Sequence, residues 1–124
     1  MAPCMQISER RIGHVTVLDL QGRLGLDEDG DVTLYEHIGA LVREGRVNIV
    51  LNLYDVTHID SCGIGAMVAK YLSVRRRGGD LKLLNLSERS HCVMAITHLL
   101  SIFEAFESED EAIQSFPFRH QTAV

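Results

Sequence analysis

The chain has 124 residues, 46% of them hydrophobic, and a formal net charge of -5. This length and apolar content indicate one domain with one core, and the negative charge excludes a global positive field for nucleic acid or anionic lipid. The first residues lack a signal-peptide layout, and no apolar run approaches the roughly 18 to 20 residues that span a bilayer, so we expect no export and no membrane insertion. Three cysteines without a CxxC pair fit a reducing, cytoplasmic location.

The N-terminal half predicts two strands, a helix and a third strand. Residues 4–13 and 14–22 are β-rich runs that we expect to form a hairpin. Residues 32–45 place apolar side chains at helical spacing and end at Gly45, which predicts a helix with a glycine cap. Residues 47–53 are almost continuously apolar, which is typical of a central strand that helices cover on both faces.

The C-terminal half continues the alternation of helix and strand. A second helix is expected to end in an arginine run, Arg75, Arg76 and Arg77, where cations oppose the helix dipole, before Gly78 and Gly79. The expected elements are a helix over 64–79, a strand over 81–86, a helix over 87–100, a short strand near 103–107 and a helix over 110–116. The order ββαβαβαβα predicts an α/β fold: a mixed four- to five-stranded sheet with about four helices. We expect one domain over residues 5–116 and a tail over 117–124.

Residues 57–63 connect the carboxyl end of the central strand to the second helix, where open α/β sheets usually carry functional groups. A purely structural interpretation is available for this turn. Asp60 or Ser61 can cap the helix by accepting a hydrogen bond from a backbone N–H, and Gly63 and Gly65 allow close packing of its first turn.

The order of residues in the turn is more particular than capping requires. Together, "DVTHIDSCGIGAMV", "RRRGGDLKLLNL" and "FEAFESEDEAIQSF" resemble the STAS family of anti-sigma factor antagonists, whose members carry Asp-Ser-Ser/Thr-Gly-Leu-Gly at this loop. The resemblance implies a STAS domain, without a cofactor or enzyme activity, that docks on an ATP-dependent anti-sigma factor and so releases a sigma factor. It further implies that the partner's serine kinase activity phosphorylates Ser61 and switches the antagonist off.

The chemistry of the turn agrees with that role. Phosphate on Ser61 suits a helix N-terminus, yet beside Asp60 in a closed interface it adds desolvation and like-charge repulsion. We assign Asp60 an accessory role and expect a monomer or weak dimer. The predicted partner-binding surface is Asp60, Ser61, Cys62, Gly63, Ile64, Gly65 and Ala66.

The chain departs from the family pattern at two places. Cys62 stands where many members have a second Ser or Thr; it is either a small packed residue or a thiol that the helix N-terminus activates for redox chemistry. The acidic segment 26–31 is either a solvated turn or a determinant of partner choice.

Other hypotheses remain for this turn. The chain is alternatively a STAS subunit of another assembly, such as a signalling scaffold or lipid transport complex, or an enzyme with Ser61 or Cys62 as nucleophile. The enzyme needs a nearby base and a concave pocket, and no base is visible in the sequence. His58 with Cys62, or His91 with Cys92 and His98, lack the spacing of zinc motifs, so we expect no metal.

The second helix presents two alternative outer faces. Small residues recur every three or four positions and would permit close approach of a neighbour. They are Cys62, Ala66, Ala69 and Ser73. In the alternative, this row lies on the sheet and the larger residues Ile64, Val68, Tyr71 and Leu72 face outward.

Overall fold

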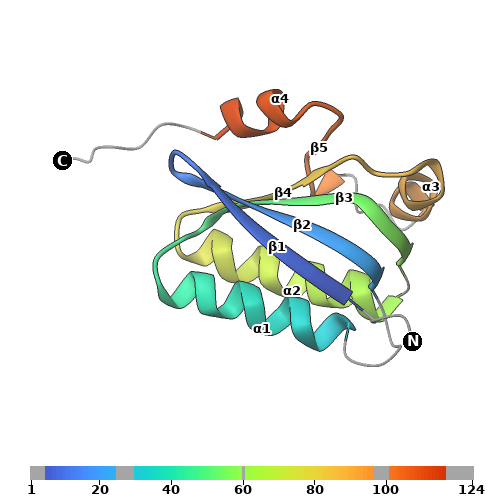
Figure 1. Cartoon of the computed structure of the whole chain (residues 1–124), viewed down its shortest axis with the longest axis horizontal. Helices are drawn as coiled ribbons and strands as arrows, with labels where there is room; N and C mark the ends of the chain where they lie inside the picture. The colour runs from blue at the N-terminus through green and yellow to red at the C-terminus, as the bar shows by residue number, and fades with distance from the viewer. Residues whose placement is uncertain (1–4, 25–29, 60, 97–100, 117–124) are drawn as a thin grey trace.

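The computed structural model describes residues 5–24, 30–59, 61–96 and 101–116, and its elements follow the predicted order (Figure 1). The strands are β1 (Met5–Ile12), β2 (Val15–Leu24), β3 (Asn48–Ile59), β4 (Asp80–Leu84) and β5 (Ala105–Phe106). The helices of the described residues are α1 (Gly30–Arg43), α2 (Ser61–Arg76), α3 (Glu88–Ile96) and α4 (Glu109–Gln114). The predicted α/β architecture is confirmed.

The five strands form one mixed sheet in the order β1-β2-β3-β4-β5. The hairpin β1–β2 is antiparallel, whereas β2, β3, β4 and β5 run parallel to one another. The apolar run of residues 47–53 therefore lies in the middle of the sheet, as predicted. Leu24 of β2 pairs with Ile59 at the end of β3, so the carboxyl ends of β2 and β3 lie side by side, whereas β4 pairs with β3 only from Asn48 to Asn52.

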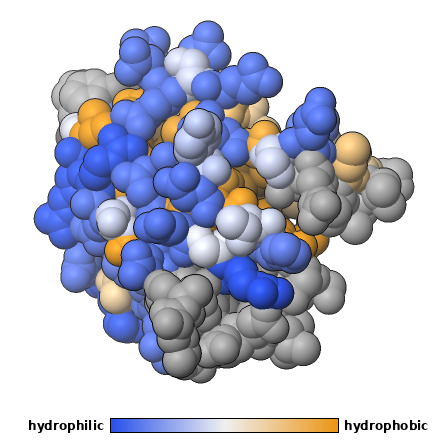
Figure 2. Space-filling view, turned by 45° about the vertical axis from the view of Figure 1, so that its right-hand side comes forward, coloured by the Kyte–Doolittle hydropathy of each residue, from blue (hydrophilic) through white to orange (hydrophobic). Residues whose placement is uncertain are grey.

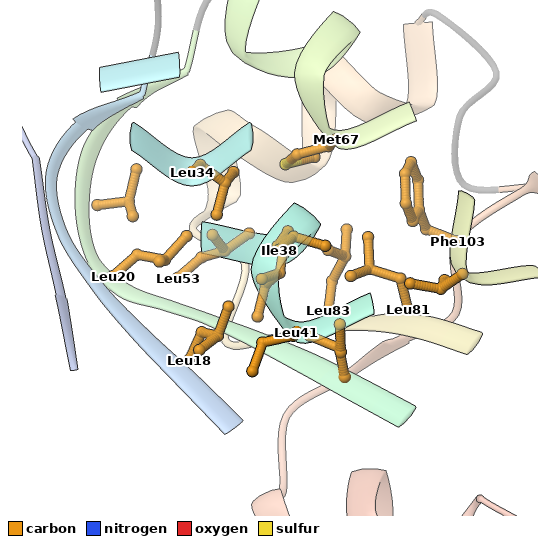
Figure 3. Packing of buried hydrophobic residues seen from close by; sticks show 14 of the residues in the cluster. Leu18, Leu20, Leu34, Ile38, Leu41, Leu53, Met67, Leu81, Leu83 and Phe103 are labelled. Atoms are coloured by element: carbon orange, nitrogen blue, oxygen red, sulfur yellow. The ribbon is translucent and has the colours of Figure 1, made fainter. Parts of the chain in front are cut away.

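The larger core lies between the sheet and the paired helices α1 and α2 (Figure 1). In Figure 3, Leu34, Ile38 and Leu41 of α1 point toward leucines of the strands. Buried side chains of α2 and α3 join the same cluster, so these two helices lie on the same side of the sheet as α1. They are Met67, Val74 and Met94.

A smaller core lies on the opposite face, under α4 (Figure 1). Ala112 and Phe116 cover apolar side chains from three strands, namely Val15, Val17, Val50 and Leu84. Val50 thus faces this core while its neighbours Ile49 and Leu51 face the larger one, which confirms that β3 is buried on both faces.

The end of α2 shows why two glycines follow the arginines. Gly78 has φ +87°, a left-handed conformation that suits glycine, and its neighbour's N–H bonds back to the carbonyl of Val74 at 2.9 Å. A Cβ on Gly79 would lie 1.9 Å from the carbonyl oxygen of Val47. The pair therefore both terminates the helix and lets β4 begin beside β3.

On the face of the sheet that carries α4, charged and polar side chains form a row beside the smaller core. Arg10 of β1 donates to both carboxylate oxygens of Asp19, at 2.6 and 2.9 Å, and to Glu109 of α4, at 2.7 and 3.2 Å. Asn52 donates to Asp19 at 2.7 Å, and Asn85 donates to Asn52 at 3.0 Å. The row crosses β1, β2, β3 and the end of β4.

The row also sets the protonation of its members. The guanidinium of Arg10 holds the pKa of the Asp19 carboxyl below its ordinary value. Burial partly opposes this effect, and the amide of Asn52 adds a further, smaller lowering. The two carboxylates in turn raise the pKa of Arg10. Arg10 and Asp19 are therefore both charged near neutral pH.

Candidate functional site

The predicted signature lies at the carboxyl end of the central strand. β3 ends at Ile59 and α2 begins at Ser61. Asp60 and the side chains of Ser61 and Cys62 fall outside the described residues. The backbone therefore puts Ser61 in the first turn of a 16-residue helix, and the roles of Asp60, Ser61 and Cys62 stay predictions.

The rest of the predicted surface spans the first two turns of α2. Gly63 is buried, Ile64 and Ala66 are half-buried, and Gly65 is exposed. Among the residues that the structure describes, a Cβ on Gly65 would have no atom within 4 Å, apart from its own helix backbone and chain neighbours. Gly63 is thus covered by the fold, whereas Gly65 faces solvent.

The second half of β3 adds exposed side chains next to this turn. β4 pairs with β3 only as far as Asn52, so residues 53–59 pair with β2 alone. Tyr54 is 75% exposed, and Asp55, Thr57 and His58 are exposed as well. Figure 2 brings this end of the molecule forward and shows hydrophobic residues between hydrophilic ones.

Sequence reasoning did not include these strand residues in the site. The signal in the sequence was the point where the apolar run stops, because the polar and aromatic side chains after it lie on the part of β3 that no longer pairs with β4. Thr57 also donates to the carbonyl of Gly22 at 3.2 Å, which ties this segment to β2.

Neither predicted face of α2 is the outer surface by itself. Of the small residues, Ala66, Ala69 and Ser73 are half-buried. Of the larger ones, Ile64, Val68 and Tyr71 are half-buried and Leu72 is 49% exposed. The buried positions are Gly63, Met67, Lys70 and Val74, a row at helical spacing that neither alternative contained. Both predicted rows therefore flank the contact with α1 and the sheet.

The charges of α2 favour a negative group at its start. Its first turn carries no acidic residue, and Arg75 and Arg76 occupy its last turn. The free N–H groups of the first turn and the helix dipole supply partial positive charge there, which an anion can use. The arginines are exposed, as predicted, and Arg75 lies 3.5 Å from Asp80.

The residues considered for metal binding lie on different elements. His58 is exposed on β3, and His91 and Cys92 are exposed on α3, while His98 falls outside the described residues. Within the described ranges, no three His, Cys, Asp or Glu side chains form a group that could hold a metal ion. The acidic segment 26–31 lies largely outside those ranges. No described helix is long and apolar enough to cross a membrane.

Comparison with known proteins defines the family. The STAS domain model matches residues 6–112, and the chain therefore belongs to the STAS domain family. An anti-sigma-B factor antagonist of Bacillus subtilis is 35% identical over 107 residues, covering 82% of this chain and 97% of the relative.

Solved structures agree with this fold. An anti-sigma factor antagonist from Mycobacterium paratuberculosis superposes with a TM-score of 0.79 at 21% identity, covering 92% of this chain and 96% of the other. The Bacillus cell fate determinant SpoIIAA in its phosphorylated form superposes with a TM-score of 0.70 at 21% identity, covering 88% and 97%.

Proposed function

We propose that this protein is an anti-sigma factor antagonist of the bacterial cytoplasm that docks on an ATP-dependent anti-sigma factor and releases the sigma factor. The partner's serine kinase activity phosphorylates Ser61 and ends the interaction. Family membership and the curated relative named an anti-sigma-B factor antagonist support this class of function. The docking surface is Asp60, Ser61, Cys62, Gly63, Ile64, Gly65 and Ala66, with the exposed end of β3 beside it.

The observation that carries the proposal is that a glycine, Gly65, stands at an exposed position inside α2. A glycine inside a helix is about 0.5 to 1 kcal/mol less favourable than alanine. Gly65 is exposed, it lacks a positive φ, and the described fold leaves open space where its Cβ would be. Nothing in the described fold requires glycine here, whereas close approach of a partner's backbone does.

The position of Ser61 supports the switch. A phosphate adds about 1.5 to 2 negative charges, which a helix N-terminus without acidic residues in its first turn accepts. In a partner-covered interface beside Asp60, the same phosphate is desolvated next to a like charge. Phosphorylation is thus compatible with the folded domain and opposes the complex.

Substitutions of Ser61 test the switch. Ser61→Ala removes the phosphate acceptor and at most a helix cap, so we expect a loss of about 0.5 to 2 kcal/mol in stability and a preserved complex. Ser61→Asp keeps a capping side chain but places an unpaired charge in the interface, which weakens binding by about 2 to 5 kcal/mol. Calorimetric melting and titration with the anti-sigma factor, with and without ATP, measure both effects.

The phosphorylation site needs its own readout. Mass spectrometry after incubation with the partner and ATP should place the phosphate on Ser61 in the parent chain and detect none in Ser61→Ala. Phosphate on Thr57 or Ser73, or unchanged affinity of Ser61→Asp, would leave Ser61 as a helix cap and refute the switch.

Gly65→Ala tests the docking surface separately from phosphorylation. We expect the variant to be more stable by about 0.5 to 1 kcal/mol, because alanine favours the helix and meets open space, and to bind the anti-sigma factor more weakly. Leu72→Ala is the matched control, since Leu72 is exposed on the same helix but lies far along it from Ser61. Equal binding by the parent chain and Gly65→Ala would contradict the proposed surface.

A further inference from the structure

A pocket of about 330 Å³ opens between α1 and α2, one helical turn beyond Ala66 of the proposed docking surface. Its lining is Tyr35, Glu36, Gly39 and Arg43 of α1 and Lys70 of α2. A volume near 300 Å³ is at the lower end of what small-molecule sites have. The pocket is thus large enough for a ligand of a few atoms with a charged end.

Lys70 is the unusual member of this lining. It is only 9% exposed and lies in the buried row of α2 with Met67 and Val74. Its ammonium stands 3.7 Å from the centre of the Tyr35 ring, and it forms no ion pair with a described residue. A cation held this deeply normally has an anionic partner, because burial without one is unfavourable.

A second cation, the guanidinium of Arg43, lies near the ammonium of Lys70 above Gly39. The position that a Cβ of Gly39 would occupy lies 3.6 Å from Nζ of Lys70 and 3.6 Å from Nη1 of Arg43. Arg43 likewise has no ion pair among the described residues. One planar anionic group above Gly39 can therefore contact both cations.

The net charge of the lining residues indicates which kind of anion the pocket would bind. Lys70 and Arg43 contribute two positive charges and Glu36 one negative charge, which leaves one positive charge to be matched. A carboxylate supplies one negative charge, whereas a phosphate monoester brings closer to two and would be repelled by Glu36. Tyr35 is 48% exposed and offers a flat apolar face to the remainder of the ligand.

We propose that this pocket binds a carboxylate whose oxygens lie between Lys70 and Arg43 and whose apolar body covers Tyr35. The carboxylate belongs either to a free organic acid or to an acidic side chain of a bound polypeptide. The site is independent of Ser61, so its failure would leave the proposed switch intact.

Titration followed by NMR of the nitrogen-15-labelled protein tests the site, with 4-methylbenzoate as the probe. We expect saturable shifts centred on the Gly39 amide with a dissociation constant of about a millimolar, in keeping with so small a ligand. The neutral 4-methylbenzamide and the dianionic 4-methylphenyl phosphate should bind at least about tenfold more weakly. Equal or tighter binding of either compound, or no binding of 4-methylbenzoate, would overturn the proposal.

Three variants distinguish binding in the pocket from a general effect of charge and from a loss of folding. Lys70→Met keeps a long apolar stem and should weaken 4-methylbenzoate binding at least about tenfold, whereas Arg76→Met removes an exposed cation of the same helix and should not. Gly39→Ala places its Cβ at ordinary contact distance, so the melting temperature should hold or rise while affinity falls. Parent-like affinity of Lys70→Met, or an equal loss in Arg76→Met, would refute the site.

Titration with a short peptide tests whether the carboxylate belongs to a free acid or to an acidic side chain of a polypeptide. Acetyl-Ala-Glu-Phe-Ala-amide is titrated against its Gln counterpart and against 4-methylbenzoate. Tighter binding of the Glu peptide than of the free acid supports an acidic side chain of a polypeptide, and the reverse supports a free acid. Equal binding of the Glu and Gln peptides, together with equal binding of 4-methylbenzamide, contradicts a carboxylate site of either kind.

Discussion

The two faces of the sheet are covered in different ways. On one face, α1 and α2 bury a large and almost wholly apolar cluster. On the other face, the six-residue helix α4 covers a small apolar cluster. Ion pairs stabilise the chain around this helix, and one of them is made by a buried lysine. The proposed switch stands at the start of α2, on the strongly packed side.

This difference between the two faces indicates how Ser61 can be phosphorylated without a loss of stability of the fold. Phosphate on Ser61 would meet a helix whose buried row packs in the larger core, so we expect a change in its first turn to leave the fold intact. The α4 face depends on electrostatic contacts, which respond to charge and pH more readily than apolar packing does.

The same substitution on each face should have unequal effects. Ile38→Ala in α1 removes a side chain that is 0% exposed and should lower the free energy of unfolding by about 2 to 5 kcal/mol. Ile113→Ala in α4 removes a half-buried side chain and should lower it by only about 1 kcal/mol. Urea unfolding measures both, and equal losses would mean that the two faces contribute alike.

Removing the charge of Lys82 should loosen the α4 face alone. Its ammonium lies 2.6 Å from Glu104 and donates to the hydroxyl of Ser115 at 2.9 Å and to its carbonyl at 3.3 Å. We expect Lys82→Met to lower stability by about 1.5 to 2 kcal/mol, the lower part of the range for charged hydrogen bonds, because Glu104 is 62% exposed and returns to water.

Hydrogen exchange locates the effect of Lys82→Met. Amides of α4 should exchange faster in the variant, while those of α1 and α2 should change only by the global loss of stability. Faster exchange in α1 and unchanged exchange in α4 would be the opposite of this expectation.

Asp19→Asn should have the smallest effect, and its size should depend on pH. The carboxylate of Asp19 is 31% exposed and its partner Arg10 is 41% exposed, so we expect a loss of only about 1 kcal/mol near pH 7. Because the folded-state pKa of Asp19 is lowered, the stabilisation is complete above its unfolded value of about 3.9 and is lost as the pH falls through the folded value.

Urea unfolding of the parent and Asp19→Asn from pH 7 to pH 2 measures this dependence. The difference between them should stay constant down to about pH 4 and shrink below it. Glu9, whose pKa is lowered chiefly by its hydrogen bond to His37, titrates in both proteins and cancels from the difference. A difference that grows in acid would show that Asp19 does not have a lowered pKa.

Much of the fold was predictable because its signals are local. Hydrophobic periodicity marked the helices, the apolar run of residues 47–53 marked a strand buried on both faces, and glycines marked the helix ends. These patterns follow from backbone geometry and hold whatever packs nearby. They placed Ser61 in the connection before a helix expected over 64–79, whereas in the structure β3 continues to Ile59 and α2 already begins at Ser61.

The position of charged groups was decided only by tertiary structure. Lys70 and Lys82 are indistinguishable in sequence from solvated lysines, yet both are buried, because Gly39 and Tyr35 receive one and Ser115 and Phe116 receive the other. Asp19 looked like an ordinary member of an alternating strand until Arg10 and Asn52 were brought beside it. Burial and ion pairing join residues far apart in the chain, and no local pattern records which of them the fold will bring together.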